Sequence, residues 1–221
     1  MYNAEKMEFS IIHKLFETAF EILLWVFFGY LFIWNWVDSV MGSGGLCSDE
    51  PYRNDMMQAY IFLILFETID MVINLPFSYY STFVIEEKYG FNKTTIGTFV
   101  SDEIKKFALT AVILALVIPL ILWLVHVSGP ALIINLAGAS IILVIILSLL
   151  IPTVIIPIFY TYTNLEDGEL RKAILKEAEK TDVNVAEIKV IDGSKRSSHS
   201  NAFVSGFWNF RKVVLFDTLI E

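Results

Sequence analysis

The sequence predicts a mainly α-helical, polytopic membrane protein with four transmembrane helices plus the start of a small α+β cytosolic domain. Hydrophobic residues make up 56% of the 221 residues and charged residues only 18%, whereas a soluble domain carries about 25% charged residues. Four long apolar stretches fall within the first 160 residues, and charged residues are concentrated in the segment that follows. These observations predict a membrane part followed by a water-soluble part.

Composition also excludes several classes of protein. A mean hydropathy of +0.62 is incompatible with a disordered chain, a collagen, a coiled coil or a soluble enzyme. The single cysteine, Cys47, excludes a disulfide framework and a cysteine-based zinc cluster within the chain. The net charge of −8 argues against nucleic acid as a partner, because phosphate binding needs clustered Lys and Arg side chains.

The charge distribution places a domain boundary near residue 160. Residues 161–221 hold nine Lys or Arg and ten Asp or Glu residues, whereas the much longer segment 1–160 holds seven and fourteen. We therefore expect a membrane domain over residues 1–160 and the start of a soluble domain over residues 161–221.

Each of the four apolar stretches is long enough to cross a bilayer, which takes roughly 20 mostly apolar residues. Pro152 and Pro157 lie in the last stretch, where they predict a kink or a continuation of the helix beyond the bilayer. The predicted spans are about residues 20–41, 56–85, 107–126 and 131–160.

Lys and Arg residues in the connections predict the orientation, because cytosolic connections are enriched in them. The second connection carries four lysines, whereas the first has only Arg53 and the third, residues 126–130, has no Lys or Arg. This alternation predicts that both termini lie in the cytosol.

The second connection, residues 86–106, is predicted to be an amphipathic segment at the membrane interface. Gly90 marks a turn within it. Residues 98–107 are expected to form a helix that enters the third span, with Ser101 or Asp102 near its start.

The soluble segment combines one amphipathic helix with about three short strands. A unit of this size is too small to bury a good core alone, so more sequence is expected to follow. Asp217 or Thr218 can cap a further helix near the end. The expected elements are a helix over residues 167–181, strands over residues 187–192, 201–207 and 212–216, and a polar loop over residues 193–200.

No complete catalytic site can be assembled from the residues present. The three histidines are His13, His126 and His199, and no two of them are spaced four residues apart on a helix. The zinc motif H-E-x-x-H, which places two imidazoles on one helical face, is absent from the sequence.

Two polar features each allow two readings. Glu67 and Asp70 lie three residues apart on one face of the second span, where acids either act in function, or line a wet cavity or hydrogen-bond a neighbouring helix without doing chemistry. The loop 193–200 combines two cations, four hydroxyls and a histidine, and is either an anion site or a solvated loop.

Two long motifs carry a family resemblance. The first is Leu-Pro-Phe-Ser-Tyr-Tyr at residues 75–80, followed by Phe-Val-Ile-Glu-Glu-Lys-Tyr-Gly-Phe-Asn-Lys at residues 83–93. The second is Gly-Ser-Lys-Arg-Ser-Ser-His-Ser-Asn-Ala-Phe at residues 193–203, followed by Val-Val-Leu-Phe-Asp-Thr-Leu at residues 213–219. In this order and spacing they resemble the type I CAAX prenyl proteases, the integral-membrane zinc metalloendopeptidases of the a-factor and prelamin A processing lineage.

The resemblance implies an activity, a cofactor and a location for the whole enzyme. Zinc and a glutamate activate a water that attacks the scissile carbonyl of a CAAX peptide whose cysteine is prenylated. Because the zinc motif is absent, the chain resembles an N-terminal-half fragment truncated before that motif, and we expect it alone to bind no zinc and to be inactive. The implied location is the endoplasmic reticulum membrane and the inner nuclear membrane, with the tail in the cytosol.

The resemblance also implies substrate-binding residues, although no catalytic or metal-binding residue is assigned within this chain. In the family, the substrate backbone lies as an added strand against an edge strand beside the zinc helix. Asn201, Ala202 and Phe203 match that strand, and Asn201 is expected to lie closest to the substrate. The alternative reading is that Asn201 only caps the start of the strand.

Two other functions stay open at this point. One is a catalytically inactive, truncated scaffold. The other is a transporter-like membrane protein in which Glu67 and Asp70 relay protons.

Overall fold

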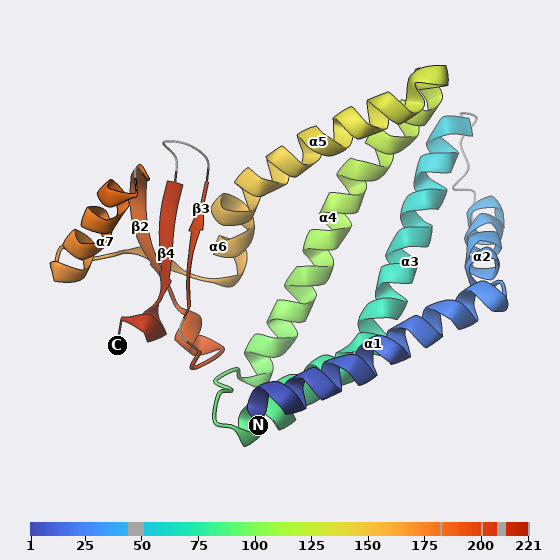
Figure 1. Ribbon diagram of the computed structural model, residues 1–221. Helices are drawn as coiled ribbons and strands as arrows, with labels where there is room; N and C mark the ends of the chain where they lie inside the picture. The colour runs from blue at the N-terminus through green and yellow to red at the C-terminus, as the bar shows by residue number, and fades with distance from the viewer. Residues whose placement is uncertain (44–50, 182, 200, 207–210, 221) are drawn as a thin grey trace. The chain divides into compact units, whose positions relative to one another are not determined.

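The computed structural model describes residues 1–43, 51–181, 183–199, 201–206 and 211–220. The chain forms two compact units (Figure 1). The first unit combines Met1–Tyr89 with Lys106–Leu136, and the second combines Gly90–Lys105 with Ala137–Glu221. The predicted boundary between a membrane domain and a soluble domain at residue 160 stays a prediction.

Helices make up the first unit. The chain rises through α1 (Tyr2–Val26) and α2 (Gly29–Ser43), continues in α3 (Pro51–Tyr80), and passes directly into a π-helical turn, η1 (Ser81–Glu86). Pro76 lies inside α3, and a proline cannot donate the backbone hydrogen bond that its helix position requires. The departure from α geometry follows within two turns of this residue.

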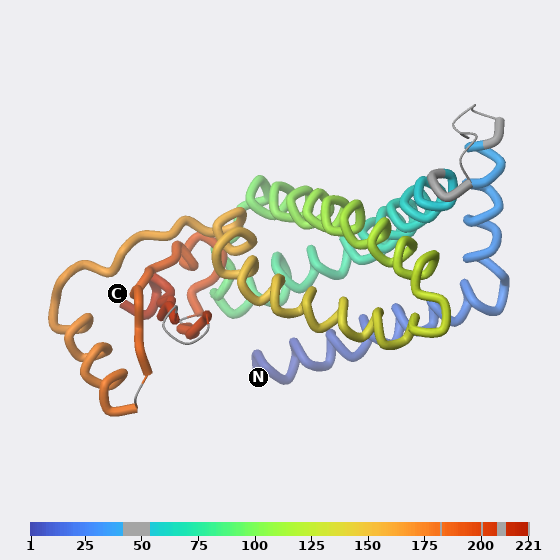
Figure 2. Tube along the Cα trace, turned by 90° about the horizontal axis from the view of Figure 1, so that it is seen from above, coloured from blue at the N-terminus to red at the C-terminus, as the bar shows by residue number. Residues whose placement is uncertain are grey.

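The first predicted span, about residues 20–41, is wrong as a single helix. The helix breaks between α1 and α2, and the two segments meet at 63°, a bend that Figure 2 also shows. Phe28 has a φ of 55° at the break, a backbone conformation that bulky side chains rarely adopt. Gly29 follows, and an added Cβ there would lie 2.7 Å from Leu24 Cδ2, so the close return of the chain depends on glycine.

The second connection, residues 86–106, contains the predicted turn and the start of helix α4. Gly90 has a φ of 73°, which confirms the predicted turn. Helix α4 (Ile96–Ser128) begins earlier than expected. It includes the predicted helix 98–107, which is thus confirmed, and starts two residues before it because Thr95 Oγ1 accepts a hydrogen bond from the Thr98 backbone N–H at 3.1 Å.

The remaining apolar stretch is helical from end to end. After α4, a 3-10 turn (Gly129–Ala131) leads into α5 (Leu132–Leu150), a π-helical turn η3 (Ile151–Ile155) and α6 (Ile156–Phe159). Pro152 lies in η3, so the helix leaves α geometry where the prolines predicted a change.

By length and composition, two of the described helical stretches could cross a membrane, Asn54–Glu86 and Ile96–Phe159, and a third is added if the bent pair α1 and α2 counts as one span. The second stretch is 64 residues long and includes both of the last two predicted spans. Large apolar side chains on it point outward, such as Leu116 at 70% exposure and Ile133 at 82%. Outward apolar side chains are typical of helices that face lipid, whereas the predicted number of four spans stays a prediction.

A four-stranded sheet and helix α7 lie in the second unit (Figure 1). Strand β2 pairs in parallel with β4, and the other two pairs are antiparallel, in the order β1-β2-β4-β3. The elements are β1 (Tyr162–Asn164), α7 (Glu169–Lys180), β2 (Val185–Ile191), β3 (Ala202–Ser205) and β4 (Arg211–Phe216).

The prediction of about three strands is corrected to four, because β1 is only three residues long and pairs with β2, far along the chain. The predicted further helix after Asp217 is a 3-10 turn (Asp217–Leu219) in the described residues. Of the predicted strand 201–207, residues 202–205 are in β3, and residue 207 lies outside the described residues.

The core of this sheet is small and apolar. Leu165, Ile188 and Leu215 are buried together, and Ile174 of α7 packs against them with valines of the central strands. This core fixes β2 and β4 in the middle of the sheet, which leaves β1 and β3 at its two edges.

Candidate functional site

Strand β3 is an edge strand that contains Ala202 and Phe203, and the third predicted substrate-binding residue, Asn201, directly precedes it. It pairs with β4 in the register Ala202↔Leu215 and Phe203↔Val214. Within the part of the chain that the structure describes, no strand covers its outer side. An uncovered edge presents backbone N–H and C=O groups that an extended peptide can pair with.

The register determines which backbone groups face outward. The Phe216 N–H donates to the Asn201 carbonyl at 3.0 Å, so these two residues form a hydrogen-bonded pair. Hydrogen-bonded and non-hydrogen-bonded pairs alternate along an antiparallel ladder. The backbone groups of Ala202 and Val204 therefore point away from β4, toward the open edge. Val204, which sequence reasoning did not single out, is 58% exposed.

The side chain of Asn201 lies at the start of this edge. Its Oδ1 accepts a hydrogen bond at 2.8 Å from the Ala202 N–H, one of the outward-facing donors. Asn201 and Ala202 are exposed, and Phe203 is half-buried. The contact fits the reading in which Asn201 caps the strand, and it also puts the amide at the outer edge where a peptide backbone would lie.

The polar loop before β3 holds its two cations against carboxylates. Lys195 Nζ lies 2.6 Å from Asp192 Oδ2. The Arg196 guanidinium forms two hydrogen bonds with Asp102, Nε to Oδ2 at 2.8 Å and Nη2 to Oδ1 at 2.9 Å. Both cations therefore have anionic partners already, and the structure gives no support to the anion-site reading of this loop.

The two ion pairs shift pKa values in the expected directions. The pKa of the Arg196 guanidinium is raised, chiefly by its hydrogen bonds to Asp102, although burial opposes the shift. Burial alone would raise the pKa of Asp192, but hydrogen bonds from Lys195 and from the Thr161 backbone N–H bring it below the ordinary range. Both groups are therefore ionised around neutral pH.

Asp217 holds the other end of the loop. Its Oδ1 accepts hydrogen bonds from the Ser194 N–H at 2.8 Å and the Thr218 N–H at 2.9 Å. The Ser194 hydroxyl donates to the second carboxylate oxygen. Thr218 Oγ1 donates in turn to the His199 carbonyl at 3.1 Å. The sequence expectation had given Asp217 only a capping role, and the structure adds this attachment.

The histidines lie in different surroundings. His13 Nε2 lies 2.7 Å from Asn74 Oδ1 in the first unit, with the ring stacked on Phe77 at 4.3 Å. His199 packs against Phe91 in the second unit, at 4.2 Å between ring centroids. Among the described residues, no three His, Cys, Asp or Glu side chains are grouped so that they could hold a metal ion.

Of the two acids of the second predicted span, Asp70 lines a hollow that Glu67 does not line. Asp70 lines a hollow of about 160 Å³ in the first unit together with Lys14, Glu17 and Asn74, whereas Glu67 is not among the lining residues. A proton relay through both acids needs a common wet path, and this hollow does not provide one.

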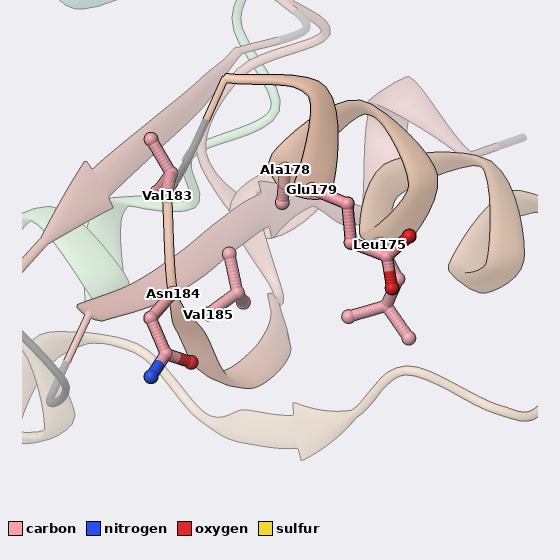
Figure 3. A pocket seen from close by; sticks show the side chains of 6 residues that line it. All are labelled: Leu175, Ala178, Glu179, Val183, Asn184 and Val185. Carbon is pink, nitrogen blue, oxygen red and sulfur yellow. The ribbon is translucent and has the colours of Figure 1, made fainter.

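A second hollow, of about 470 Å³, lies where α7 ends and β2 begins (Figure 3). It is wide open and contains none of the residues predicted to bind substrate. Its lining is Leu175, Ala178, Glu179, Val183, Asn184 and Val185.

Comparison with known families extends over nearly the whole chain. Residues 1–161 match the family described as CAAX prenyl protease N-terminal, five membrane helices. Residues 164–221 match peptidase family M48. The chain belongs to the CAAX prenyl protease family of M48 peptidases. The resemblance inferred from the two sequence motifs is thus confirmed, and the chain is an integral membrane protein.

Individual relatives agree with this assignment. The chain is 34% identical over 221 residues to the CAAX prenyl protease 1 homolog of Homo sapiens, covering 100% of this chain and 46% of the relative. It is 36% identical to the homolog of Arabidopsis thaliana, with 100% and 51% covered. The crystal structure of S. mikatae Ste24p superposes with a TM-score of 0.88 at 33% identity, covering 100% of this chain and 50% of that one. The chain thus spans about half the length of these relatives.

Proposed function

We propose that the whole protein is an integral-membrane zinc metalloendopeptidase that cleaves the C-terminal CAAX motif of prenylated proteins. The observation that carries this proposal is the match of both family halves, in order, along one chain. Similarity over the whole of this chain to relatives named CAAX prenyl protease 1, of which it covers 46% and 47%, supports it. The chain contributes membrane helices and one edge of the sheet to this enzyme.

In the proposed reaction, β3 binds the substrate backbone. An extended CAAX peptide would add to the sheet beside β3 and pair with the outward carbonyl of Ala202, whose N–H already donates to Asn201 Oδ1, and with the outward backbone groups of Val204. The Asn201 amide would set the register, because it can accept from one peptide group and donate to the next. Phe203 faces the other side of the strand and would contribute packing rather than hydrogen bonds.

Zinc belongs to the proposal for the whole protein. When bound in such an enzyme it polarises the scissile carbonyl and lowers the pKa of a water. The described residues of this chain do not assemble a group that could hold the ion. In this proposal the residues of β3 bind and orient the substrate.

The proposal includes a place in the cell. The chain would cross the membrane four times, expose the segment from residue 161 to the cytosol, and reside in the endoplasmic reticulum and the inner nuclear membrane. Prenylated proteins present their modified C-terminus at the cytosolic surface of membranes, so a cytosolic peptidase domain would meet its substrate directly.

The test is cleavage of a defined peptide by the purified whole protein. A farnesylated CAAX peptide should be cut, and the same peptide without the farnesyl group should be cut far more slowly. Removal of zinc with a chelator should abolish cleavage, and added zinc should restore it. A protein that holds zinc and is folded but cuts neither peptide would leave the scaffold reading in its place.

A further inference from the structure

The loop that precedes β3 is joined to the chain segment that precedes α4. The Lys93 N–H donates to the Arg196 carbonyl at 3.1 Å, and the Ser198 N–H donates to the Phe91 carbonyl at 3.0 Å. Asn92 and Ser197 face each other in an antiparallel bridge. We call this contact between residues 91–94 and 196–198 the latch. All of its residues belong to the second unit.

Arg196 is the charged centre of the latch. Besides its two hydrogen bonds to Asp102, its Nη2 donates to the Phe159 carbonyl at 2.7 Å, and its guanidinium lies 4.4 Å from the centroid of the Tyr160 ring. The Arg196 and Asp102 side chains are only 17% and 14% exposed. A planar fork that binds a carboxylate with two hydrogen bonds and stacks on a ring needs arginine, and lysine cannot reproduce it.

Arg196 of the latch lies five residues before Asn201, which directly precedes β3. From Arg196 the chain passes through Ser197, whose Oγ accepts from the His199 N–H at 3.2 Å, and through His199, whose ring packs on Phe91. It then reaches Asn201, whose carbonyl is bonded to β4. Asn201 is thus fixed to the sheet on one side, and the loop that leads into it is fixed to the start of α4 on the other.

The latch is separate from the core that folds the sheet. Leu165, Ile188 and Leu215 form that core without Arg196 or Asp102. Loss of the guanidinium should therefore release the loop while β2 and β4 remain paired. This separation distinguishes a residue that positions the strand from one that only keeps the domain folded.

We propose that Arg196 is a positioning residue for peptide cleavage. Through Asp102 it fixes residues 193–199 to the first turns of α4, and thereby the place of Asn201 and of the outward edge of β3. The inference rests on the proposed function, because it assigns a second residue to the same docking edge. Small errors in substrate placement have large kinetic effects, since a shift of about 1 Å can slow a reaction about 100-fold.

The first experiment measures hydrogen exchange in the whole protein and does not depend on activity. Arg196→Gln and Asp102→Asn should each speed backbone exchange in residues 91–95 and 193–202, while exchange in β2 and β4 stays as in the wild type. Lys195→Gln is the matched control in the same loop, because that side chain is 65% exposed and pairs only locally with Asp192. Unchanged exchange in both Arg196→Gln and Asp102→Asn would show that this ion pair does not anchor the loop to α4.

The second experiment measures cleavage of the farnesylated CAAX peptide. Arg196→Gln and Asp102→Asn should lower kcat/KM by on the order of 10- to 100-fold at unchanged zinc content, whereas Lys195→Gln should stay within about twofold of the wild type. Asp102→Asn keeps the test decisive if Arg196→Gln does not fold. Faster exchange combined with wild-type cleavage would refute the positioning role.

A disulfide across the latch supplies the rescue. Residues that face each other in an antiparallel bridge have Cβ atoms about 4.5–5.5 Å apart, close to disulfide geometry. In a Cys47→Ser background, Asn92→Cys and Ser197→Cys should restore cleavage to Arg196→Gln when oxidised and lose it again when reduced. The same cysteine pair with Arg196 present controls for the loss of the Asn92 hydrogen bond to the Thr94 N–H. Equal rates in both redox states would contradict positioning.

Failure of this inference and failure of the proposed function look different. If the wild-type protein cuts no prenylated peptide, the proposed function and the positioning role fail together, and the exchange data alone decide the anchoring of the loop. If the wild type cuts the peptide and the latch variants cut it equally well, only the positioning role fails.

Discussion

The structure shows Asn201 as a cap of β3 and the proposed function adds a role in docking, and substitution can separate the two. Its Oδ1 already accepts from the Ala202 N–H, whereas its Nδ2 would donate to a docked peptide. We predict that Asn201→Ala in the whole protein lowers kcat/KM for the farnesylated peptide about 5- to 150-fold, which corresponds to roughly 1–3 kcal/mol for an unpaired polar group. Zinc content and thermal unfolding should stay close to wild type.

The informative companion is Asn201→Asp. A carboxylate can still accept from the Ala202 N–H but has no proton to donate to a peptide at neutral pH. If Asn201→Asp is as slow as Asn201→Ala, the amide donor is needed for docking. If it cuts at the wild-type rate, Asn201 acts only as the cap of β3.

Gly193 lies where a side chain has no room. A Cβ added there would lie 2.2 Å from Cδ1 of Phe216 and 3.0 Å from its Cε1. The Phe216 ring is itself placed against Tyr160, at 6.4 Å between centroids, so it cannot move without disturbing a neighbour. We predict that Gly193→Ala lowers the free energy of unfolding by about 1–3 kcal/mol, as overpacking usually does.

Thermal unfolding of the purified protein checks this prediction against a matched substitution. Gly138→Ala adds the same methyl group in α5, where nothing lies within 4 Å of the new Cβ. It should leave the melting temperature unchanged or raise it, because alanine favours a helix more than glycine does. Equal melting temperatures for the two variants would show that Phe216 adapts freely.

The ionisation of Asp192 makes the stability of the folded protein depend on pH. Its pKa in the folded protein lies below the ordinary value, so the unfolded state takes up the proton first as the pH falls. The contribution of Asp192 is therefore present above its unfolded pKa of about 3.9 and is lost as the pH drops through the lower folded pKa. We predict that the difference in melting temperature between wild type and Asp192→Asn shrinks when the pH is lowered from 7 to 3.

A control for this pH series is available on the surface. Asp167→Asn removes a carboxylate that is 91% exposed, lies two residues before α7 and pairs with Arg171 of that helix. Such a pair contributes little to stability at any pH, so the melting temperature of this variant should follow the wild-type curve throughout. A constant difference for Asp192→Asn from pH 7 to pH 3 would contradict the assigned direction of the shift.

At the scale of whole elements, the sequence was informative wherever a local pattern decides the structure. The amphipathic period predicted residues 167–181 and α7 covers Glu169–Lys180. Alternation predicted residues 212–216 and β4 covers Arg211–Phe216. In both cases apolar residues at regular intervals face one small core, and the period alone specifies the element.

Elements that depend on distant partners escaped prediction. Strand β1 has three residues and exists because β2, more than 20 residues later, pairs with it. The break between α1 and α2 falls inside an uninterrupted apolar run, and hydropathy does not indicate the positive φ that Phe28 adopts there. The glycine that follows was the one local indication, because glycine permits the close approach of Leu24.

In the candidate site, too, features set by a local motif were predicted from the sequence and contacts between distant residues were not. The motif around Asn201 located the edge strand because that motif is continuous in sequence. The Arg196–Asp102 pair joins residues 94 positions apart, and no spacing rule connects a loop arginine to an aspartate at the start of a membrane helix. Ion pairs between Lys6 and Glu86 and between Glu5 and Lys88 were hidden for the same reason, since each joins α1 to a segment about 80 residues away.

At the scale of the whole molecule, the arrangement of the chain across the membrane can be tested with a reporter it already contains. The sequence has one N-glycosylation acceptor motif, Asn92-Lys93-Thr94. It lies in the second connection, which carries the lysines that predict a cytosolic location. Four crossings place this motif and the tail in the same compartment. A single crossing by the 64-residue stretch Ile96–Phe159 would place them in opposite compartments.

We predict that Asn92 is not glycosylated when the protein is made in microsomes, whereas an acceptor motif inserted at Gly44, in the first connection, is modified. An acceptor inserted in the tail at Gly168 should stay unmodified, because the predicted spans 107–126 and 131–160 return the chain to the cytosol. A motif inserted at Gly129 should be modified for the same reason.

A shift in mass sensitive to a glycosidase identifies each modified site. Modification of the acceptor in the tail would rule out four crossings. Modification of Asn92 would show that the orientation is opposite to the predicted one. Either outcome would contradict the predicted location of β3, the proposed docking edge, on the side of the membrane where prenylated proteins are found.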